Sequence, residues 1–317
     1  MSETLLIRGY HHVTLCVGSA QEDYDFHVKV LGLRLIKKTV LLDGAEPFYH
    51  LYYGNELGEE GSLVTTFPMP WRNTGSRGSG QVRVLSLGVP DGSLAFWQRR
   101  LEGFGYKTAT AERLGAKRVG FTHPCGIEYE FVEAGHDTKG AWTGGGVPAE
   151  VAIQGIRSVA VSARDLPQFD AFLVDALGFA SEGRDGRDAR FAIGHGRKAR
   201  VLEVLHEPDR PQGSWTYACG TVHHIAFDLP DGQVQQGLKA HLEGLGYVDV
   251  SEIKDRNYFN SIYVRTPSGA LFEAAVTQER GWLKDETWET LGRELQLPAW
   301  LESRKGEMVA KLEPIRD

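Results

Sequence analysis

Two histidine doublets lie near opposite ends of the chain, and each heads a short run of alternating apolar residues that is typical of a β-strand. His11 and His12 head the first run, and His223 and His224 head the second. Neutral imidazole is the commonest metal ligand among protein side chains. Successive side chains of a strand face opposite ways, so only one histidine of each doublet is expected to point into a shared site. Alternation places His12 on the face of Tyr10, but the spacing alone does not decide which histidines point inward.

A glutamate follows a glycine by four residues in two equivalent segments of the chain. Glu273 follows Gly269 in this way, and Glu130 follows Gly126. Two imidazoles and one carboxylate on rigid strands form a facial triad that leaves open coordination positions and suits Fe(II), although Mn(II) or Zn(II) also accept such ligands. The repeat that contains Glu130 has Val84 at the histidine position, so Glu273 is the preferred ligand.

The elements that must position these residues recur four times along the chain. Each copy reads as a strand, a helix that ends before a glycine, and further short alternating strands, which predicts a βαβββ module. The four copies begin near residues 8, 81, 154 and 221. Their predicted helices span residues 20–31, 93–104, 166–177 and 233–245. The predicted fold class is α+β, with a helical tail at the C-terminus.

The glycine-rich stretch 143–148 has the composition of a linker and suggests a domain boundary. We expect residues 1–146 to form an N-terminal domain from modules 1 and 2. Residues 147–317 would then form a C-terminal domain from modules 3 and 4 and the tail.

The composition limits what the protein can bind. The 317 residues include 35 Lys and Arg against 42 Asp and Glu, a net charge of −7, which disfavours nucleic acid and anionic membranes as partners. Cys16, Cys125 and Cys219 form no C-x-x-C pair, and each is expected to be a small buried residue rather than part of a disulfide framework. No stretch approaches the ~18 apolar residues of a membrane span, so a cytoplasmic location is expected.

The two doublets and the segment 266–273 (Thr-Pro-Ser-Gly-Ala-Leu-Phe-Glu) resemble the vicinal oxygen chelate superfamily, and within it the hydroquinone ring-cleaving dioxygenases. The resemblance covers nearly the whole chain and includes residues 49–53, 65–68, 205–215 and 297–298. It implies four βαβββ modules paired into two domains. It also implies an Fe(II)-dependent, extradiol-type dioxygenase that inserts both atoms of O2 into a 1,4-dihydroxylated aromatic ring.

Carried over to this chain, the resemblance implies that His12, His224 and Glu273 hold Fe(II), with Mn(II) as the alternative ion, and that no organic cofactor is needed. It also implies catalytic or supporting roles for five further residues, with His223 preferred as acid and base: His11, Thr14, His223, Arg256 and Tyr263. The implied partners are a small aromatic substrate and O2. A homo-oligomer is expected.

Three alternatives remain open. The first is a dioxygenase whose substrate is a catechol. The second is a glyoxalase-type isomerase or lyase, but such an enzyme typically needs a second carboxylate, and Thr65 occupies that position. The third is a metal-free binding module, which the intact triad disfavours. Other histidines, His50 among them, are expected on the surface or in structural hydrogen bonds. Five aromatic residues are candidates for lining a substrate pocket: Trp71, Trp215, Tyr258, Phe259 and Phe67.

Overall fold

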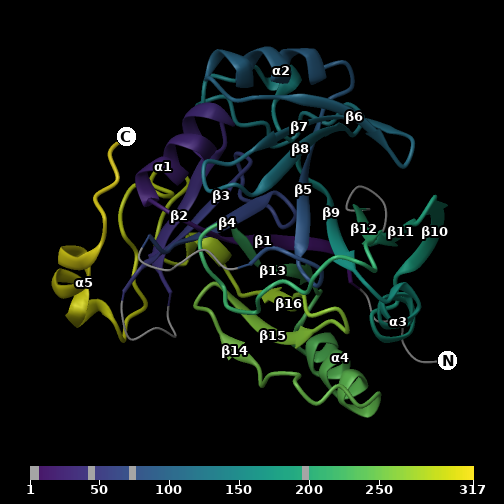
Figure 1. The fold of residues 1–317 in the computed structure, drawn as a ribbon. Coiled ribbons are helices and arrows are strands. Elements are labelled where there is room, and N and C mark those ends of the chain that lie inside the picture. The colour runs from purple at the N-terminus through teal and green to yellow at the C-terminus, as the bar shows by residue number, and fades with distance from the viewer. Residues whose placement is uncertain (1–6, 42–46, 71–75, 195–199) are drawn as a thin grey trace.

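The computed structural model describes residues 7–41, 47–70, 76–194 and 200–317, and within them the four βαβββ modules follow one another in chain order (Figure 1). Module 1 consists of β1 (Gly9–Val17), α1 (Ala20–Tyr24), η1 (Asp25–Val30), β2 (Arg34–Val40), β3 (Tyr49–Gly54) and β4 (Leu63–Pro68). Module 2 consists of β5 (Val82–Val89), α2 (Leu94–Gly103), β6 (Ala109–Arg113), β7 (Ala116–Thr122) and β8 (Glu128–Glu133).

The second half of the chain repeats this order. Module 3 begins after the short helix η2 (Ala149–Val151) and consists of β9 (Gly155–Ala163), α3 (Leu166–Ala171), η3 (Phe172–Ala176), β10 (Ala180–Asp185), β11 (Asp188–Ile193) and β12 (Arg200–His206). Module 4 consists of β13 (Thr221–Asp228), α4 (Gly232–Gly244), β14 (Lys254–Asp255), β15 (Phe259–Arg265) and β16 (Leu271–Thr277). The predicted α+β fold of four βαβββ modules is confirmed.

Each module helix starts and stops where the sequence indicates. The carboxylate of Asp231 accepts hydrogen bonds from the backbone amides of Gln233 and Val234, which caps the first turn of α4. A glycine with positive φ follows each helix, at Gly32, Gly105, Gly178 and Gly246. The helices of modules 1 and 3 change from α to π geometry partway along, at η1 and η3, which the periodicity does not predict.

The strands form two eight-stranded sheets that combine modules distant in sequence. The first sheet has the order β14-β15-β16-β13-β1-β4-β3-β2 and joins modules 4 and 1. The second sheet has the order β10-β11-β12-β9-β5-β8-β7-β6 and joins modules 3 and 2. Since each sheet takes strands from both 1–146 and 147–317, the division into two domains at this boundary stays a prediction.

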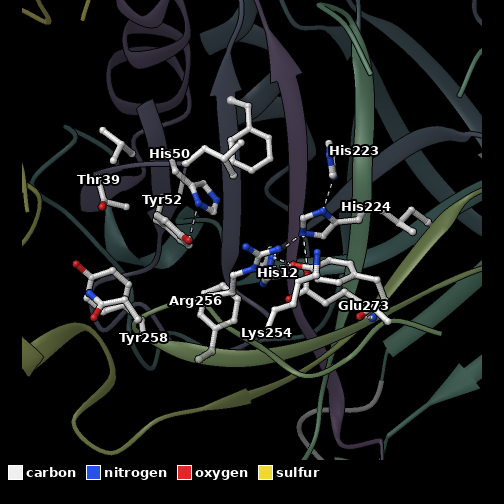
Figure 2. Close-up of a pocket in the computed structure, with 18 residues that line it drawn as sticks. His12, Thr39, His50, Tyr52, His223, His224, Lys254, Arg256, Tyr258 and Glu273 are labelled. Carbon is white, nitrogen blue, oxygen red and sulfur yellow. Dashed lines mark hydrogen bonds and ion pairs between the residues drawn. The ribbon is translucent and has the colours of Figure 1, made fainter. Parts of the chain in front are cut away.

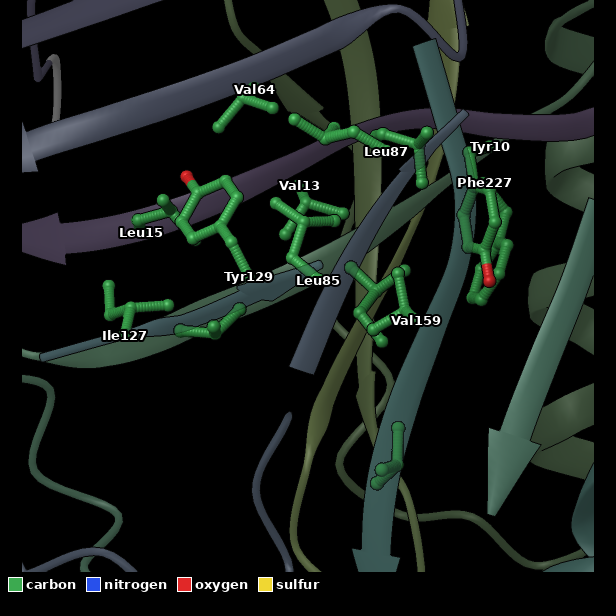
Figure 3. Packing of buried hydrophobic residues seen from close by; sticks show 14 of the residues in the cluster. Tyr10, Val13, Leu15, Val64, Leu85, Leu87, Ile127, Tyr129, Val159 and Phe227 are labelled. Atoms are coloured by element: carbon green, nitrogen blue, oxygen red, sulfur yellow. The ribbon is translucent and has the colours of Figure 1, made fainter. Parts of the chain in front are cut away.

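A large apolar core packs against the faces of the strands that carry no site residues. Figure 3 shows Val13 and Leu15 of β1 in one cluster with Leu85 of β5 and Val159 of β9. All four side chains are fully buried, and each such side chain contributes about 1.5–3 kcal/mol by leaving water. Burial of these alternate residues forces the intervening side chains of β1 onto the opposite face of the sheet.

A β-bulge in β1 redirects the side chains at the first doublet. Tyr10 pairs with Phe227 and His12 pairs with Ala226, so His11 is an extra residue in β1. Tyr10 therefore turns into the core, where its ring stacks on that of Phe227 with centroids 5.7 Å apart. The expectation that Tyr10 shares a face with His12 is wrong, because simple alternation fails at a bulge.

A second bulge lies at the other doublet. Thr14 pairs with His224 and Leu15 pairs with Val222, so His223 is the extra residue in β13. Both doublets therefore sit where a strand bends, and bulges of this kind commonly re-aim side chains beside active sites.

The C-terminal tail packs on the body of the molecule, as predicted, and contains η5 (Gly281–Lys284), η6 (Glu302–Arg304) and α5 (Lys305–Lys311). The Trp282 ring lies 4.8 Å from that of Tyr52, and the buried ammonium of Lys37 forms an ion pair of 2.6 Å with Asp285. Figure 1 shows α2 over β7 and β8, and α4 beside β15. Within the described ranges, no helix has both the length and the hydropathy to cross a bilayer.

Candidate metal centre

Three buried side chains from three neighbouring strands of the first sheet converge on one point. His12 comes from β1, His224 from β13 and Glu273 from β16, and their ligand atoms lie within 4.8 Å of one another. The two Nε2 atoms are 2.9 Å apart, and Glu273 Oε2 lies 2.8 Å from His224 Nε2 and 3.8 Å from His12 Nε2. Figure 2 shows these side chains directed at one another at the end of a cavity.

The carboxylate of Glu273 has one oxygen for which the chain supplies no hydrogen-bond donor of suitable geometry. Oε1 accepts a hydrogen bond from Ser261, whereas the buried Oε2 accepts none. Leaving a buried acceptor unsatisfied costs about 1–3 kcal/mol, and more when the group is charged. Two imidazole nitrogens and an unsatisfied carboxylate oxygen in one place fit a divalent cation, so the donor set suits a metal.

The protonation states favoured by the surroundings also suit a metal. Burial lowers the pKa of His12 well below its usual range, which keeps the imidazole neutral. Burial alone would raise the pKa of Glu273, but the imidazoles of His224 and His12 and the hydrogen bond from Ser261 outweigh it and hold the pKa well below its usual range. Metal ligands must be deprotonated, and the surroundings hold His12 and Glu273 in that form.

The first histidine of each doublet is hydrogen-bonded to the second and orients it. A hydrogen bond of 2.8 Å joins the Nδ1 atoms of His11 and His12, and one of the same length joins those of His223 and His224. Nε2 of His11 is bonded to Thr277, whose hydroxyl donates to Glu60. Because Nδ1 of His12 and of His224 is hydrogen-bonded to the neighbouring histidine, Nε2 of each ring points at the site. Metal-bound histidines are commonly oriented by a hydrogen bond of this kind on the nitrogen that does not bind the metal.

A cavity of about 360 Å³ opens from the three ligands and receives three of the predicted residues. His223, Arg256 and Tyr263 line it, and Arg256 Nε donates to the Tyr263 hydroxyl at 3.2 Å. Burial lowers the pKa of His223 well below its usual range, so this imidazole is neutral and can accept a proton. Burial and the nearby Glu273 raise the pKa of Tyr263, which keeps the phenol protonated.

The other two residues predicted to have catalytic or supporting roles, His11 and Thr14, lie outside the cavity. His11 is fully buried behind His12 and does not line the cavity. The Thr14 hydroxyl lies 2.8 Å from His224 Nε2 and 2.7 Å from the Thr65 hydroxyl. Both residues contact the candidate ligands rather than the space where a substrate would lie.

Among the cavity residues that sequence reasoning missed are His50 and Tyr52 of β3. A hydrogen bond of 2.8 Å joins the Tyr52 hydroxyl and His50 Nδ1, and His50 Nε2 lies 3.0 Å from the Thr65 hydroxyl. Through Thr65 and Thr14 this chain reaches His224. His50 and Tyr52 are two apart on β3 and so share a face, which was the available signal. His50 makes structural hydrogen bonds, as expected, but it makes them in the wall of the cavity.

The predicted aromatic residues divide into two groups. Tyr258, Phe259 and Phe67 line the cavity. Trp215 does not, because its side chain is 57% exposed and packs with Arg265 at 4.9 Å. Trp71 lies outside the described residues.

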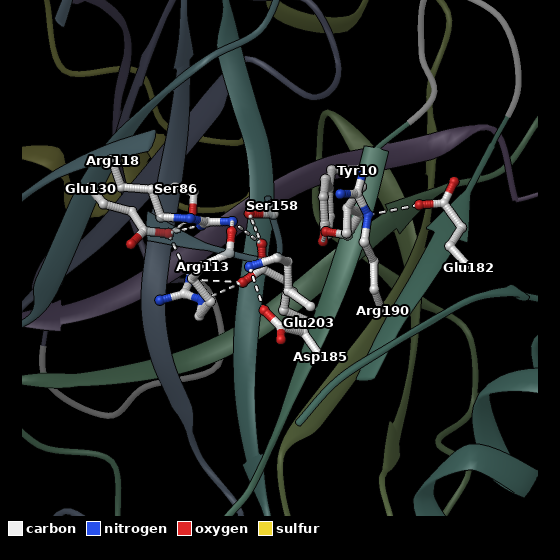
Figure 4. A network of polar contacts seen from close by, with 12 residues as sticks. Tyr10, Ser86, Arg113, Arg118, Glu130, Ser158, Glu182, Asp185, Arg190 and Glu203 are labelled. Carbon is white, nitrogen blue, oxygen red and sulfur yellow. Dashed lines mark hydrogen bonds and ion pairs between the residues drawn. The ribbon is translucent and has the colours of Figure 1, made fainter. Parts of the chain in front are cut away.

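Glu130, the other carboxylate at a glycine-plus-four position, has its charge balanced elsewhere. It lies in the second sheet, where Ser86, Arg113 and Arg118 donate to Oε1 (Figure 4). The Glu130 carboxylate thus has several hydrogen-bond donors, which agrees with the prediction that Glu273 rather than Glu130 is the metal ligand.

The paired eight-stranded sheets and the two-histidine, one-glutamate cluster define a protein of the vicinal oxygen chelate class. In agreement, glyoxalase I from Zea mays has the same fold, with a TM-score of 0.63 over 90% of this chain and 97% of that one, at 13% identity. A scan against protein-family models finds no match.

Sequence comparison is more specific. The chain is 45% identical over 309 residues to chlorohydroquinone/hydroquinone 1,2-dioxygenase of Sphingobium indicum, covering 96% of this chain and 95% of the relative. It is 38% identical to the candidate ring-cleaving dioxygenase MhqO of Bacillus subtilis, covering 96% of each. A solved structure of a candidate dioxygenase from Bacillus subtilis superposes with a TM-score of 0.92 at 36% identity, covering 99% of both chains. The chain belongs to the ring-cleaving dioxygenase family.

Proposed function

We propose that this dioxygenase depends on Fe(II) held by His12, His224 and Glu273, and that it cleaves a hydroquinone-type ring beside a hydroxyl-bearing carbon, in extradiol fashion. The observation that carries the proposal is the convergence of these ligand atoms, with Glu273 Oε2 unsatisfied, at the end of an aromatic-lined cavity. The 45% identical relative, named for hydroquinone and chlorohydroquinone, supports this class of substrate.

When bound, Fe(II) would supply open coordination positions at which O2 and a ring hydroxyl can meet and exchange electrons. Mn(II) is the alternative ion for the same ligands. The identity of the ion, like the expected homo-oligomer, is a prediction that metal analysis and solution mass can check.

The cavity walls would bind and orient the ring. Phe67 and Phe259 offer apolar faces, and together with Leu41 and Leu271 they exclude water from the ligands. At about 360 Å³, the cavity has room for a substituted single ring and a diatomic gas. Holding the reactants side by side in this way lowers the entropic part of the barrier.

Three side chains would handle protons and developing charge. His223, neutral and partly exposed in the cavity, would take the proton that the ring hydroxyl loses. The guanidinium of Arg256 and the phenol of Tyr263, joined at 3.2 Å, would donate hydrogen bonds to negative charge that develops on oxygen. His11 and Thr14 would position the ligands, because they contact His12 and His224 from outside the cavity.

Oxygen uptake tests the proposal. The protein is loaded with Fe(II) without air and then given O2 with hydroquinone, methylhydroquinone or catechol. We expect consumption of about one O2 per ring with the hydroquinones, because a dioxygenase incorporates both atoms. Preference for catechol would reassign the substrate, and absence of uptake with all three would overturn the proposal.

Two variants and another metal separate the alternatives. Glu273→Gln should abolish uptake, whereas Glu130→Gln, at a glycine-plus-four position of the other sheet, should retain it. Activity of the Ni(II) or Zn(II) protein on a thiol hemiacetal would instead favour a glyoxalase reaction. That reaction is disfavoured because Thr65, bonded to Thr14 and His50, stands where the further carboxylate is needed.

A further inference from the structure

A chain of four polar side chains lies outside the metal centre and joins three modules. It runs from Asp23 on α1 to His123 and Cys125 in the turn between β7 and β8, and then to Cys219 in the connection between β12 and β13. His123 Nε2 lies 3.2 Å from Asp23 Oδ1, and His123 Nδ1 lies 2.9 Å from Cys125 Sγ. The thiols of Cys125 and Cys219 are close enough for each to shift the pKa of the other.

The hydrogen bonds determine which nitrogen of His123 carries the proton. The backbone amide of Cys125 donates to Nδ1 at 3.1 Å, so Nδ1 must hold a lone pair, and Nε2 donates its proton to Asp23. Burial alone would raise the pKa of Asp23, but His27 and His123 outweigh it and keep the carboxylate ionised. His123 Nδ1 is therefore a base directed at the Cys125 thiol.

A second group of possible metal ligands lies here, because the ligand atoms of Asp23, His27 and His123 are within 4.8 Å of one another. Their atoms are engaged differently from those of the metal centre. Asp23 Oδ2 accepts from Tyr53 at 2.8 Å, and His27 Nε2 is bonded to the Tyr129 hydroxyl at 3.0 Å. These contacts, with those of His123, favour a hydrogen-bonded relay to the thiol.

The backbone holds the two cysteine segments against each other. Gly220, next to Cys219, has φ +86°, and a Cβ placed there would lie 2.6 Å from the Cys125 carbonyl oxygen. Only glycine allows this approach. Arg77 Nη2 donates to the same carbonyl at 3.2 Å, which brings a positive charge beside Cys219.

The two thiols differ in reactivity. Interaction with the Cys125 thiol lowers the pKa of Cys219 to about 7, and Arg77 acts in the same direction. The same interaction, together with burial, raises the pKa of Cys125. Cys219 is partly exposed, whereas the third cysteine, Cys16, is buried. A thiolate that is both low in pKa and accessible is the form that reacts with oxidants.

We propose that Cys125 and Cys219 are a redox modification site that a peroxide converts reversibly to a disulfide. The Cys219 thiolate attacks one peroxide oxygen and the O–O bond breaks; the other oxygen leaves, with a proton, as an alcohol or water, and Cys219 becomes a sulfenic acid. Cys125 then gives its proton to His123 Nδ1 and attacks the Cys219 sulfur. The hydroxide that leaves takes this proton and departs as water. Two thiols are oxidised by two electrons, and one peroxide is reduced.

The disulfide would link the second sheet, through the β7–β8 turn, to the segment that enters β13 of the first sheet. Tyr217, two residues before Cys219, packs on His223 with ring centroids 3.9 Å apart. The bond would thus fix a segment that contacts a cavity residue. The inference does not depend on the proposed iron or substrate.

Peptide mapping of the full-length protein tests the site. Protein treated briefly with hydrogen peroxide is unfolded in guanidinium chloride, alkylated at its free thiols, digested without reductant and analysed by mass spectrometry. We expect one cross-linked pair of peptides containing Cys125 and Cys219, alkylated Cys16, and loss of the cross-link with dithiothreitol. Free thiols at both positions, or separate sulfinic acids without a cross-link, would overturn the proposal.

Variants divide the reaction into its two steps. Cys125→Ser should stop at a sulfenic acid on Cys219 that dimedone traps, and Cys219→Ser should leave Cys125 reduced. His123→Gln should still form the sulfenic acid but should close the disulfide about 100-fold more slowly, the usual size of a lost general base. Cys16→Ala is the matched control and should form the cross-link at the native rate. Unchanged closure in His123→Gln would remove His123 from the proposal.

Discussion

The two sheets share one framework and differ at its centre. In the first sheet His12 pairs with Ala226, Ala226 pairs with Glu273, and His224 pairs with Thr14. The second sheet repeats this register, with Val84 paired to Ala160, Ala160 to Glu203, and Ser158 to Ser86. Val84, Ser158 and Glu203 thus stand in the places of His12, His224 and Glu273.

The second sheet balances its carboxylates with arginines. Arg118 lies 2.8 Å from Glu203 Oε1, and Arg113 lies 2.7 Å from both Glu203 Oε2 and Glu130 Oε1 (Figure 4). Burial alone would raise the pKa of Glu203, but Arg113 and Arg118 outweigh it and lower the pKa below its usual value. Buried charges in proteins are paired or bind metals. The second sheet pairs its carboxylates with guanidinium groups, whereas the first places imidazoles beside Glu273 and leaves room for a metal.

The bulges are common to both sheets. Arg83 and Arg157 are the extra residues of β5 and β9, as His11 and His223 are of β1 and β13. The bulges are therefore a property of the fold. What differs is the side chain carried there, because imidazole can accept the Nδ1 proton of a neighbouring ligand histidine and arginine, which has no acceptor, cannot.

The largest effect should come from removing a ligand of the first sheet. His224→Ala and Glu273→Ala should lose bound metal altogether, since two ligands do not hold Fe(II) in competition with water. Metal analysis after anaerobic Fe(II) loading and gel filtration measures this. Glu130→Ala is the control and should retain metal, because Glu203 still balances the arginines. Metal retained by both ligand variants would refute the site.

Removing an arginine from the second sheet should reduce stability and leave metal binding intact. Arg118→Met leaves the buried Glu130 and Glu203 without one cation, which costs about 3–5 kcal/mol. Urea unfolding measures the loss. Arg83→Met is the matched control, because its partner Glu128 is half-exposed and such pairs contribute about 0–1 kcal/mol. Equal losses in the two variants would contradict the role assigned to the buried network.

Changing a bulge residue should weaken metal binding without abolishing it. His11→Phe removes the hydrogen bond to His12 Nδ1 and should lower metal affinity about 10–100-fold. Chelator competition measures the affinity. Arg83→Met, at the corresponding bulge of the second sheet, is the control and should bind metal with native affinity. Native affinity in His11→Phe would show that His11 does not orient His12.

Acid should act on His50 of the first sheet and on Glu203 of the second in different pH windows, with a small effect per group. Burial lowers the pKa of His50 below 6.5, so the unfolded chain takes up the proton first, and stability falls as the pH drops below about 6.5. Glu203 has its pKa lowered below 4.5, so its contribution is lost only as the pH drops below about 4.5. Each group adds a slope of about 1.4 kcal/mol per pH unit.

Unfolding free energies of the metal-free protein between pH 7 and 3 check this pattern. We expect His50→Gln to reduce the slope between about pH 6.5 and 5, and Glu203→Gln to change it only below about pH 4.5. A change in the upper window for Glu203→Gln would show that the two sheets do not titrate independently.

Local patterns carry much of the information on this fold and its site. The four βαβββ modules could be predicted because a helix period, a helix-ending glycine and alternating strands are all encoded within about ten residues of one another. Comparison of the modules in register identified the two doublets and Glu273 as candidates, and the family resemblance selected His12 and His224 within the doublets. The same comparison could not orient Tyr10, because the bulge at His11 breaks the alternation on which that reasoning depends.

The sequence by itself determined the modules and the residue types able to hold a metal, since both depend on short-range spacing. Only the tertiary structure decided that module 1 pairs with module 4 and module 2 with module 3. That pairing brings His12 to His224 across 212 residues, supplies arginines to one pair of glutamates, and sets Cys125 beside Cys219. Such contacts depend on how sheets assemble, and no local spacing records them.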